Sequence, residues 1–257
     1  MTMDERDASS TTTQVDLTIR DRFNSPIHAA TRFVAQRGLL KPLVWSLTKV
    51  AVVGRERLAD VKGGFIVVAN HSSHLDTPLI VGALPRRLAR YLAAGAAADY
   101  FFDVWWRRGL TALFFNAFPV QRNRSGKRGI SAKTLLLRGV PLLVFPEGTR
   151  SKDGELGPFK PGAAALASSC DVPCVPLALV GAHIAHPRGT NWPKRGRPPV
   201  GVVFGDPMRA HAGESAAAFN ERLRLEILRL RDTNTATILG APATAPTSRR
   251  INKGPRS

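Results

Sequence analysis

The chain has 257 residues, of which 44% are hydrophobic, so it has enough apolar material for one or two packed domains. Its charge is unusual, because 37 Lys and Arg residues oppose only 19 Asp and Glu residues and give a formal net charge of +18. A field of this sign attracts nucleic acid, anionic lipid headgroups or acidic substrates. Cys170 and Cys174 are too few for a disulfide framework or a metal site, and we interpret them as small buried thiols in a reducing compartment.

The ends of the chain predict disorder rather than targeting signals. Residues 1–22 form a polar lead-in without the apolar core of a signal peptide. Residues 233–257 form a basic tail with little to bury, which also predicts disorder. The sequence contains no apolar run of the roughly 20 residues that a membrane-spanning helix needs. We therefore expect any contact with a membrane to be lateral.

Residues 23–50 predict a pair of short amphipathic helices. Apolar residues leave a stripe along this segment, and Gly38 and Pro42 are expected to break it into two helices. Such helices either pack on the core or lie in a membrane interface. Trp45, close to cationic residues, favours the interface.

Residues 51–232 predict one α/β domain, because short β-branched runs alternate with helical segments. The fold class that we expect is a mostly parallel central sheet covered by helices. Strands are predicted at 65–70, 90–94, 117–121, 141–146, 174–180 and 199–205, and helices at 78–84, 97–115, 126–138, 161–169 and 215–231. Ligands of such sheets bind at loops that follow the carboxyl ends of strands. The loops after Asn70 and after Pro146 are therefore the candidate sites.

The first loop contains a histidine and an aspartate that suit proton transfer. His71 precedes Asp76 by five residues, so the loop can fold back and let the carboxylate orient the imidazole ring. The pair suits an attacking hydroxyl that belongs to the substrate. With six histidines in the chain, this spacing also arises by chance, but its position at the end of a strand favours catalysis. We interpret His74 as a packing or capping residue, and Ser72 and Ser73 as helix caps.

The second loop, which contains Glu147, Gly148, Thr149 and Arg150, suits the binding of an anion. Gly148 permits a turn whose amides converge on an anion, and Arg150 offers a planar fork that matches phosphate. Glu147 either positions an acceptor hydroxyl or restrains Arg150. An ordinary turn with exposed charges is the alternative interpretation of this loop.

Two further cations lie at similar positions in the predicted fold. Arg122 follows the predicted strand 117–121, and Lys160 precedes a small-residue helix whose N-terminus favours anions. An aromatic and cationic stretch at residues 100–108 is typical of an interfacial anchor, although a buried helix is the alternative.

These motifs resemble, in content and order, the 1-acylglycerol-3-phosphate (lysophosphatidic acid) acyltransferase family over about residues 65–180. The resemblance rests on NHSSHLD, the basic segment after AFPVQ, FPEGTRS and VPCVPLAL. It implies that His71 and Asp76 are catalytic. It also implies that Arg122 and the Glu147–Arg150 loop bind the glycerol phosphate. His74 departs from the family, which commonly has a bulky aromatic residue there.

The resemblance implies acyl transfer from acyl-CoA or acyl carrier protein to a lysophospholipid acceptor at the cytoplasmic face of a membrane. The thioester is a co-substrate, and we expect no metal and no further cofactor. The residues leave two alternatives open. One is the same chemistry on another lysolipid or glycolipid, and the other is a non-enzymatic basic protein that binds membrane or nucleic acid. The sequence has no zinc spacing or RNA-binding signature that favours nucleic acid.

Overall fold

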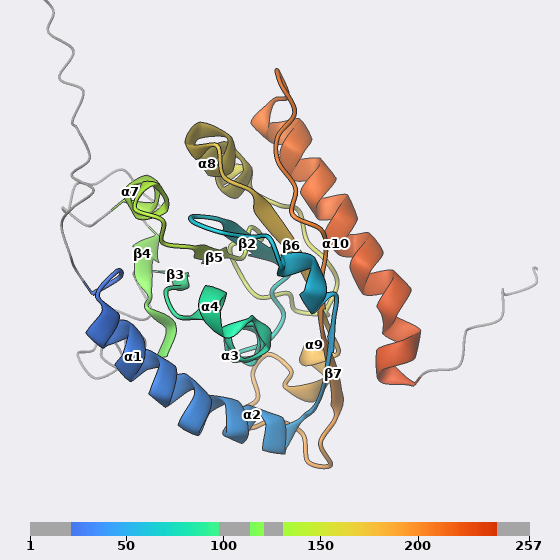
Figure 1. Ribbon diagram of the computed structural model, residues 1–257. Helices are drawn as coiled ribbons and strands as arrows, with labels where there is room; N and C mark the ends of the chain where they lie inside the picture. Colours follow the sequence, from blue (N-terminus) through green and yellow to red (C-terminus); the bar gives the residue numbers. More distant parts are fainter. Residues whose placement is uncertain (1–21, 98–113, 121–130, 241–257) are drawn as a thin grey trace, which may run out of the picture.

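The computed structural model describes residues 22–97, 114–120 and 131–240 (Figure 1). Most of the predicted lead-in, residues 100–108, Arg122 and residues 241–257 lie outside the described residues. Most of the predicted helix 97–115 lies outside them as well. Within the described residues, no helix is long and apolar enough to cross a bilayer.

The described residues form a seven-stranded sheet in the order β1-β7-β6-β2-β5-β3-β4. Neighbouring strands are parallel, except that β6 and β7 are antiparallel. This mixed sheet confirms the predicted fold class. The strands are β1 Lys49–Val53, β2 Ile66–Ala69, β3 Ala93–Ala97, β4 Phe118–Val120, β5 Leu142–Val144, β6 Cys174–Val180 and β7 Pro199–Phe204.

Helices cover both faces of the sheet, so its central strands are buried on both sides. In β2, Val67 and Ala69 face one hydrophobic cluster while Ile66 and Val68 face the other, which is the two-residue alternation of a strand. Such a strand is apolar throughout, as in parallel sheets generally. One face carries α3 Asp76–Ala83, α4 Arg86–Ala89, α9 Ala182–Ala185 and the 3-10 turn η2 Arg55–Leu58, and the other carries α7 Ala132–Leu137, α8 Gly162–Cys170 and α10 Ala216–Leu239.

The N-terminal segment is one continuous helical rod rather than the predicted pair. It consists of α1 Pro26–Ala35, a π-helical turn η1 Gln36–Leu40 and α2 Lys41–Leu47. Pro42 has no N–H group to donate, and the chain accommodates it with a wider turn instead of a break. The predicted break at Gly38 and Pro42 is therefore wrong.

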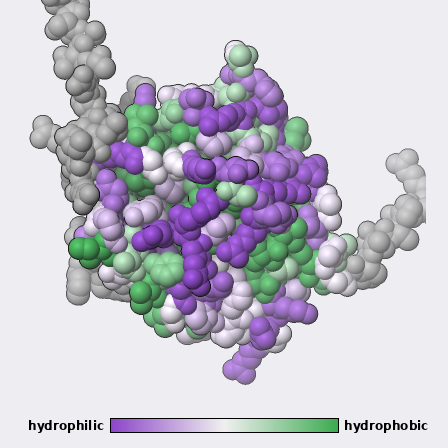
Figure 2. Space-filling view, viewed as in Figure 1, coloured by the Kyte–Doolittle hydropathy of each residue, from purple (hydrophilic) through white to green (hydrophobic). Residues whose placement is uncertain are grey.

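This rod is turned with its cations toward the protein. Arg32 is 3% exposed and donates hydrogen bonds to the Asn116 side chain and the Arg90 carbonyl, and burial lowers its pKa to about 10. Arg37 donates to the carbonyl of Gly82. The outward face is apolar instead, with Ile27 77%, Val34 68%, Leu39 61% and Leu43 52% exposed. Figure 2 shows hydrophobic residues gathered along the lower left edge, where Figure 1 places α1 and α2.

Three predicted boundaries need correction. The boundary between residues 50 and 51 cuts through β1, which was missed because this half-exposed strand lies at the edge of the described sheet and pairs there with β7. The strand predicted at 90–94 lies at Ala93–Ala97, where pairing with β5 determines its register. The tail predicted from residue 233 is helical as far as Leu239, because α10 continues until Gly240 adopts a left-handed conformation and caps it.

Candidate active site

The loop after β2 is anchored to the neighbouring strand β6 at its first residue. The Asn70 side chain donates to the carbonyl of Leu179 at 3.1 Å and accepts from the amide of Leu179 at 2.7 Å. Asn70 is buried, so these two bonds also satisfy a polar group that would otherwise be costly to remove from water. The residues that follow Asn70 therefore begin from a fixed position at the carboxyl edge of the sheet.

His71 and Asp76 meet in this loop as their spacing suggests. Nδ1 of His71 lies 2.8 Å from Oδ2 of Asp76, and the same oxygen accepts the amides of Ser72 and Ser73 at 2.7 and 2.8 Å. Asp76 is fully buried at the first residue of α3, where the helix N-terminus stabilises a negative charge. Because a carboxylate only accepts, Nδ1 carries the proton and Nε2 is left as the proton acceptor.

The His71 ring is held on its face as well as at its edge. It stacks on Phe145 with centroids 4.0 Å apart and ring planes 16° apart. The His71 side chain is 22% exposed, so the ring is fixed by the protein yet open on one side. Phe145 was not among the predicted site residues. Its place immediately before the second loop was the signal available in the sequence.

Glu147 lies in a different environment from the one expected of a group that binds substrate. Its Oε1 accepts the His71 amide at 2.7 Å, and its Oε2 accepts the Gly157 amide at 3.2 Å. Burial raises the pKa of this carboxyl, and the two amides partly oppose that rise. In return, the amide of Ser151 donates to the carbonyl of His71 at 2.8 Å. Glu147 therefore ties the two loops together.

The remaining predicted residues of the second loop form a turn beside a lysine. The amide of Gly148 donates to the Phe145 carbonyl, and Gly148 has a φ of +73°. A methyl group at Gly148 would lie 2.8 Å from Nζ of Lys160, so this exposed cation passes directly over the turn. Thr149 is exposed and Arg150 is partly exposed. The turn thus gathers two cations and a hydroxyl within one small region of the surface.

His74 lies at the surface within reach of the charge on Arg150. Reduced solvation, together with the positive charges of Arg150, His186 and His71, lowers the pKa of His74 to about 4. His74 is consequently neutral at neutral pH, and Arg150 is close enough to the first loop to affect it.

A third segment, after α9, supports both loops and was missed by the sequence analysis. The Ser73 hydroxyl donates to the His186 carbonyl at 3.0 Å, and buried His186 directs its Nε2 at the Thr190 carbonyl at 3.1 Å. Arg188 donates to the carbonyl of Arg150 at 3.1 Å. The contacts of Ser73 with His186 and of Arg150 with Arg188 join residues 113 and 38 positions apart, so no local sequence pattern predicts them.

The predicted capping role of the two serines is wrong. The residue at the N-cap of α3 is Leu75, which makes no side-chain cap. The Ser73 hydroxyl accepts a hydrogen bond from the Leu75 amide, and the amides of both serines donate hydrogen bonds to Oδ2 of Asp76. The serines therefore support the carboxylate rather than the helix end.

The described residues offer no evident place for a metal ion. Among them, no group of three or more His, Cys, Asp or Glu side chains lies close enough to bind one. Cys170 and Cys174 are both free thiols, and burial raises the pKa of Cys174 to about 12, which makes it a poor metal ligand or nucleophile.

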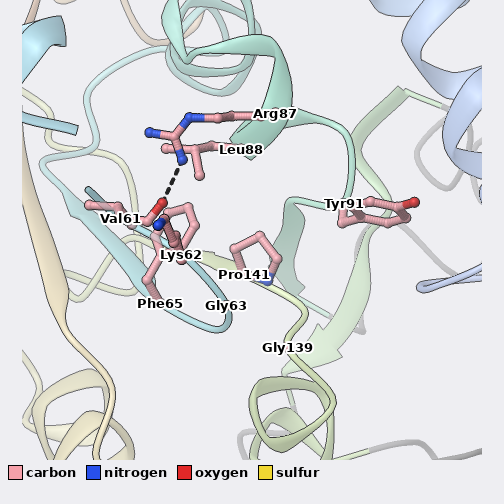
Figure 3. A pocket seen from close by; sticks show the side chains of 9 residues that line it. All are labelled: Val61, Lys62, Gly63, Phe65, Arg87, Leu88, Tyr91, Gly139 and Pro141. Atoms are coloured by element: carbon pink, nitrogen blue, oxygen red, sulfur yellow. Dashed lines mark hydrogen bonds between the residues drawn. The ribbon is translucent and has the colours of Figure 1, made fainter. Parts of the chain in front are cut away.

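A hollow of about 260 Å³ lies at the other end of the sheet, where β2 and β5 begin (Figure 3). Arg87 is the arginine in its lining, and its guanidinium donates to the carbonyls of Leu58, Ala59 and Val61. His71 follows the carboxyl end of β2, so this hollow is not the candidate active site. Its lining is formed by Val61, Lys62, Gly63, Phe65, Arg87, Leu88, Tyr91, Gly139 and Pro141.

Comparisons with known proteins agree with this arrangement. The family model described as Acyltransferase matches residues 49–180, which include both loops. A 1-acyl-sn-glycerol-3-phosphate acyltransferase of Limnanthes douglasii is 32% identical over 131 residues, covering 49% of this chain and 44% of that protein. The human 1-acyl-sn-glycerol-3-phosphate acyltransferase alpha is 36% identical over 125 residues, covering 45% and 40%.

A solved structure shares the fold over most of its length. The crystal structure of the 1-acyl-sn-glycerophosphate (LPA) acyltransferase PlsC from Thermotoga maritima superposes with a TM-score of 0.61 and 26% identity, covering 82% of each chain. The chain spans less than half the length of the two curated relatives above.

Proposed function

The chain belongs to the acyltransferase family, and we propose that it transfers a fatty acyl group from a thioester to the free hydroxyl of 1-acylglycerol-3-phosphate. The product is phosphatidic acid. The observation that carries this proposal is the His71–Asp76 pair, at 2.8 Å, beside a turn that gathers Arg150 and Lys160. A base next to an anion-binding turn suits an acceptor that has both a hydroxyl and a phosphate.

In the proposed mechanism, His71 is the general base. Its Nε2 removes the proton of the acceptor hydroxyl as the oxygen attacks the thioester carbonyl. Asp76 stabilises the imidazolium that forms and keeps the ring in the correct tautomer. The tetrahedral intermediate collapses with loss of the thiolate, which takes the proton back from His71. One ester bond replaces one thioester bond, and no protein nucleophile is required.

The acceptor phosphate is proposed to bind at the second loop. Arg150 supplies a planar fork, Gly148 a turn, Thr149 a hydroxyl and Lys160 a second cation. Arg122 is proposed to add a third cation, in keeping with its position in the sequence motif. Glu147 is proposed to hold the loops together, since both of its oxygens accept backbone amides.

The donor is proposed to be acyl-CoA or acyl carrier protein, with no further cofactor. The outward apolar face of the N-terminal rod supports contact with a membrane, because Ile27, Val34, Leu39 and Leu43 are exposed while Arg32 and Arg37 point inward. Since both lipids of the reaction reside in a bilayer and the donors are cytoplasmic thioesters, we place the protein at the cytoplasmic face. It would lie on that surface as a peripheral or monotopic protein.

The test is lipid analysis after the purified protein is incubated with mixed acyl-CoAs, or with the same acyl groups on acyl carrier protein, and one acceptor at a time. The acceptors are lysophosphatidic acid, lysophosphatidylcholine and monoacylglycerol. We expect phosphatidic acid as the main product, and we expect Arg150→Gln to raise the KM for lysophosphatidic acid by about ten- to a hundredfold, the loss of one charged hydrogen-bonding group.

Two outcomes would contradict the proposal. Equal turnover of monoacylglycerol would show that the acceptor phosphate is not recognised. Absence of acyl transfer to every acceptor, from either donor, would contradict an acyltransferase function.

A further inference from the structure

The segment after α9 carries a cluster of exposed cations around one exposed tryptophan. We name residues 187–197 the basic loop. Trp192 is 80% exposed, and Arg188, Lys194, Arg195 and Arg197 are all exposed. The loop has no acidic residue, so none of these charges is neutralised from within it. A single exposed tryptophan is ordinary by itself, but a tryptophan among four cations is the combination typical of protein surfaces that meet a membrane interface.

The basic loop is hydrogen-bonded near its start to the second active-site loop and at its end to α2. Near its start, Arg188 donates to the carbonyl of Arg150 in the second active-site loop at 3.1 Å. At its end, Arg197 donates to the carbonyl of Trp45 at the end of α2 at 3.0 Å. The amide of Lys194 also donates to the carbonyl of Ala185, which closes the loop on α9.

The loop therefore bridges the apolar rod and the active site. Figure 1 shows the segment that leads into β7 emerging beside the C-terminal end of α2. In Figure 2 the lower tip of the molecule, in the same place, is strongly hydrophilic, whereas hydrophobic residues gather toward α1 and α2. An apolar surface thus adjoins a cationic rim, and the cationic rim adjoins the loop that contains Arg150.

We infer that the basic loop is a docking site for an anionic bilayer, in which Trp192 enters the headgroup region and the cations bind lipid phosphates. Indole rings favour the membrane interface, and each Lys or Arg close to an anionic surface strengthens binding. The inference rests on the proposed function, because that function requires a lipid acceptor to reach the active site. It adds a second contact to the one proposed for α1 and α2.

The arrangement has a consequence for how the acceptor is reached. Arg188 lies four residues before Trp192 and holds the main chain of Arg150, and His186 at the foot of the loop holds Ser73 of the first active-site loop. A bilayer bound at Trp192 would consequently lie close to the proposed phosphate-binding turn. Lysolipid could then enter the active site from the headgroup layer without leaving the membrane.

The experiment is vesicle flotation of the full chain with two loop variants, Trp192→Ala and Lys194→Glu/Arg195→Glu. Vesicles contain either phosphatidylcholine alone or phosphatidylcholine mixed with phosphatidylglycerol. The matched control is Lys62→Glu/Lys133→Glu, which changes the net charge equally at exposed positions before β2 and on α7. Acyl transfer to lysophosphatidic acid dispersed in a non-ionic detergent is measured for each protein.

We expect the double loop variant to bind the anionic vesicles about tenfold or more weakly than the wild type, and the matched control to change by less than about threefold. Trp192→Ala should weaken binding to both kinds of vesicle. Turnover in detergent should stay unchanged in both loop variants, because the changed side chains lie outside the proposed catalytic machinery.

Several results would overturn the inference. One is binding of the loop variants to anionic vesicles as tight as that of the wild type. Another is an equal loss of vesicle binding in the matched control, which would show that net charge alone determines the binding. Absence of wild-type binding to the anionic vesicles, together with tight binding to duplex DNA in a gel-shift assay, would identify a different partner and overturn the inference. If instead no protein transfers acyl groups in detergent while the loop variants lose vesicle binding, membrane binding by the loop is supported, whereas the proposed function and the acceptor route that depends on it fail.

Discussion

Glu147→Gln distinguishes a residue that binds substrate from one that holds two loops together. The carboxylate accepts two backbone amides, from His71 at 2.7 Å and from Gly157 at 3.2 Å. A glutamine has one acceptor oxygen, so its NH2 group would face one of these amides without a bond. Loss of one charge-assisted hydrogen bond costs about 1.5–3 kcal/mol. Burial raises the pKa of Glu147, so the neutral side chain regains part of the desolvation cost, and we expect a net loss of about 1–2 kcal/mol.

This loss of free energy of unfolding corresponds to a fall in Tm of roughly 2–8 °C for a domain of this size. Because His71 shifts with its own amide, kcat should fall by about ten- to a hundredfold, as for other small misplacements of reacting groups. The KM for lysophosphatidic acid should change by less than about threefold, since no contact with the acceptor is lost.

Thermal unfolding and steady-state kinetics measure these effects, with Glu155→Gln as the matched control. Glu155 is 73% exposed and pairs with Arg231 at the surface, so the same substitution there should change little. A large rise in KM with an unchanged Tm and kcat would refute the reasoning, because it would mean that Glu147 acts on the substrate.

Three further changes test other parts of the site. Asp76→Asn should lower kcat on the order of a thousandfold while the protein still folds, because the amide cannot stabilise the imidazolium; activity within about threefold of wild type would contradict this role. Gly148→Ala should cost about 1–2 kcal/mol in thermal unfolding and weaken acceptor binding, because φ is +73° and the methyl group would approach Nζ of Lys160. The pKa of His74 is lowered to about 4 in the folded protein, below its unfolded value of about 6.5. The contribution of neutral His74 to the free energy of unfolding is therefore fully present above about pH 6.5 and is lost as the pH falls toward 4. His74→Asn should therefore show a smaller fall in Tm than the wild type between these pH values, and an equal fall would contradict the assignment.

The parts of the fold that follow from the sequence are those determined by local burial. The run CVPLALV is buried at every position and forms β6 as predicted, because a central strand covered by helices on both faces is apolar throughout. In α10, Phe219, Leu223, Ile227 and Leu230 recur at helical spacing and are all buried. Such segments can be predicted from the sequence, since the spacing of their apolar residues matches the periodicity of burial in the folded element.

The parts that the sequence did not predict depend on contacts between distant residues. Lys49–Val53 becomes a strand because it pairs with β7, which lies about 150 residues later in the chain. The inward orientation of Arg32 depends on Asn116 and on the carbonyl of Arg90. Periodicity alone assigns an arginine to the solvent face, so it cannot identify an apolar face that points outward.

The candidate site divides in the same way. The neighbourhood of His71 and Asp76 is local and was predictable from their spacing and their position after a strand. The support given by Phe145, Glu147 and His186 reaches across three loops and required the structure. Arg122 lies outside the described residues, so its role in binding the acceptor stays a prediction.

The most direct test of the central claim is the rate of acyl transfer by purified His71→Ala protein. The assay follows formation of phosphatidic acid from acyl-CoA and lysophosphatidic acid, and the Tm of each protein shows that the variant is folded. Removal of a general base should reduce kcat by about a hundred- to ten-thousandfold, with vesicle binding unchanged. Undiminished acyl transfer by a folded His71→Ala protein would contradict the account.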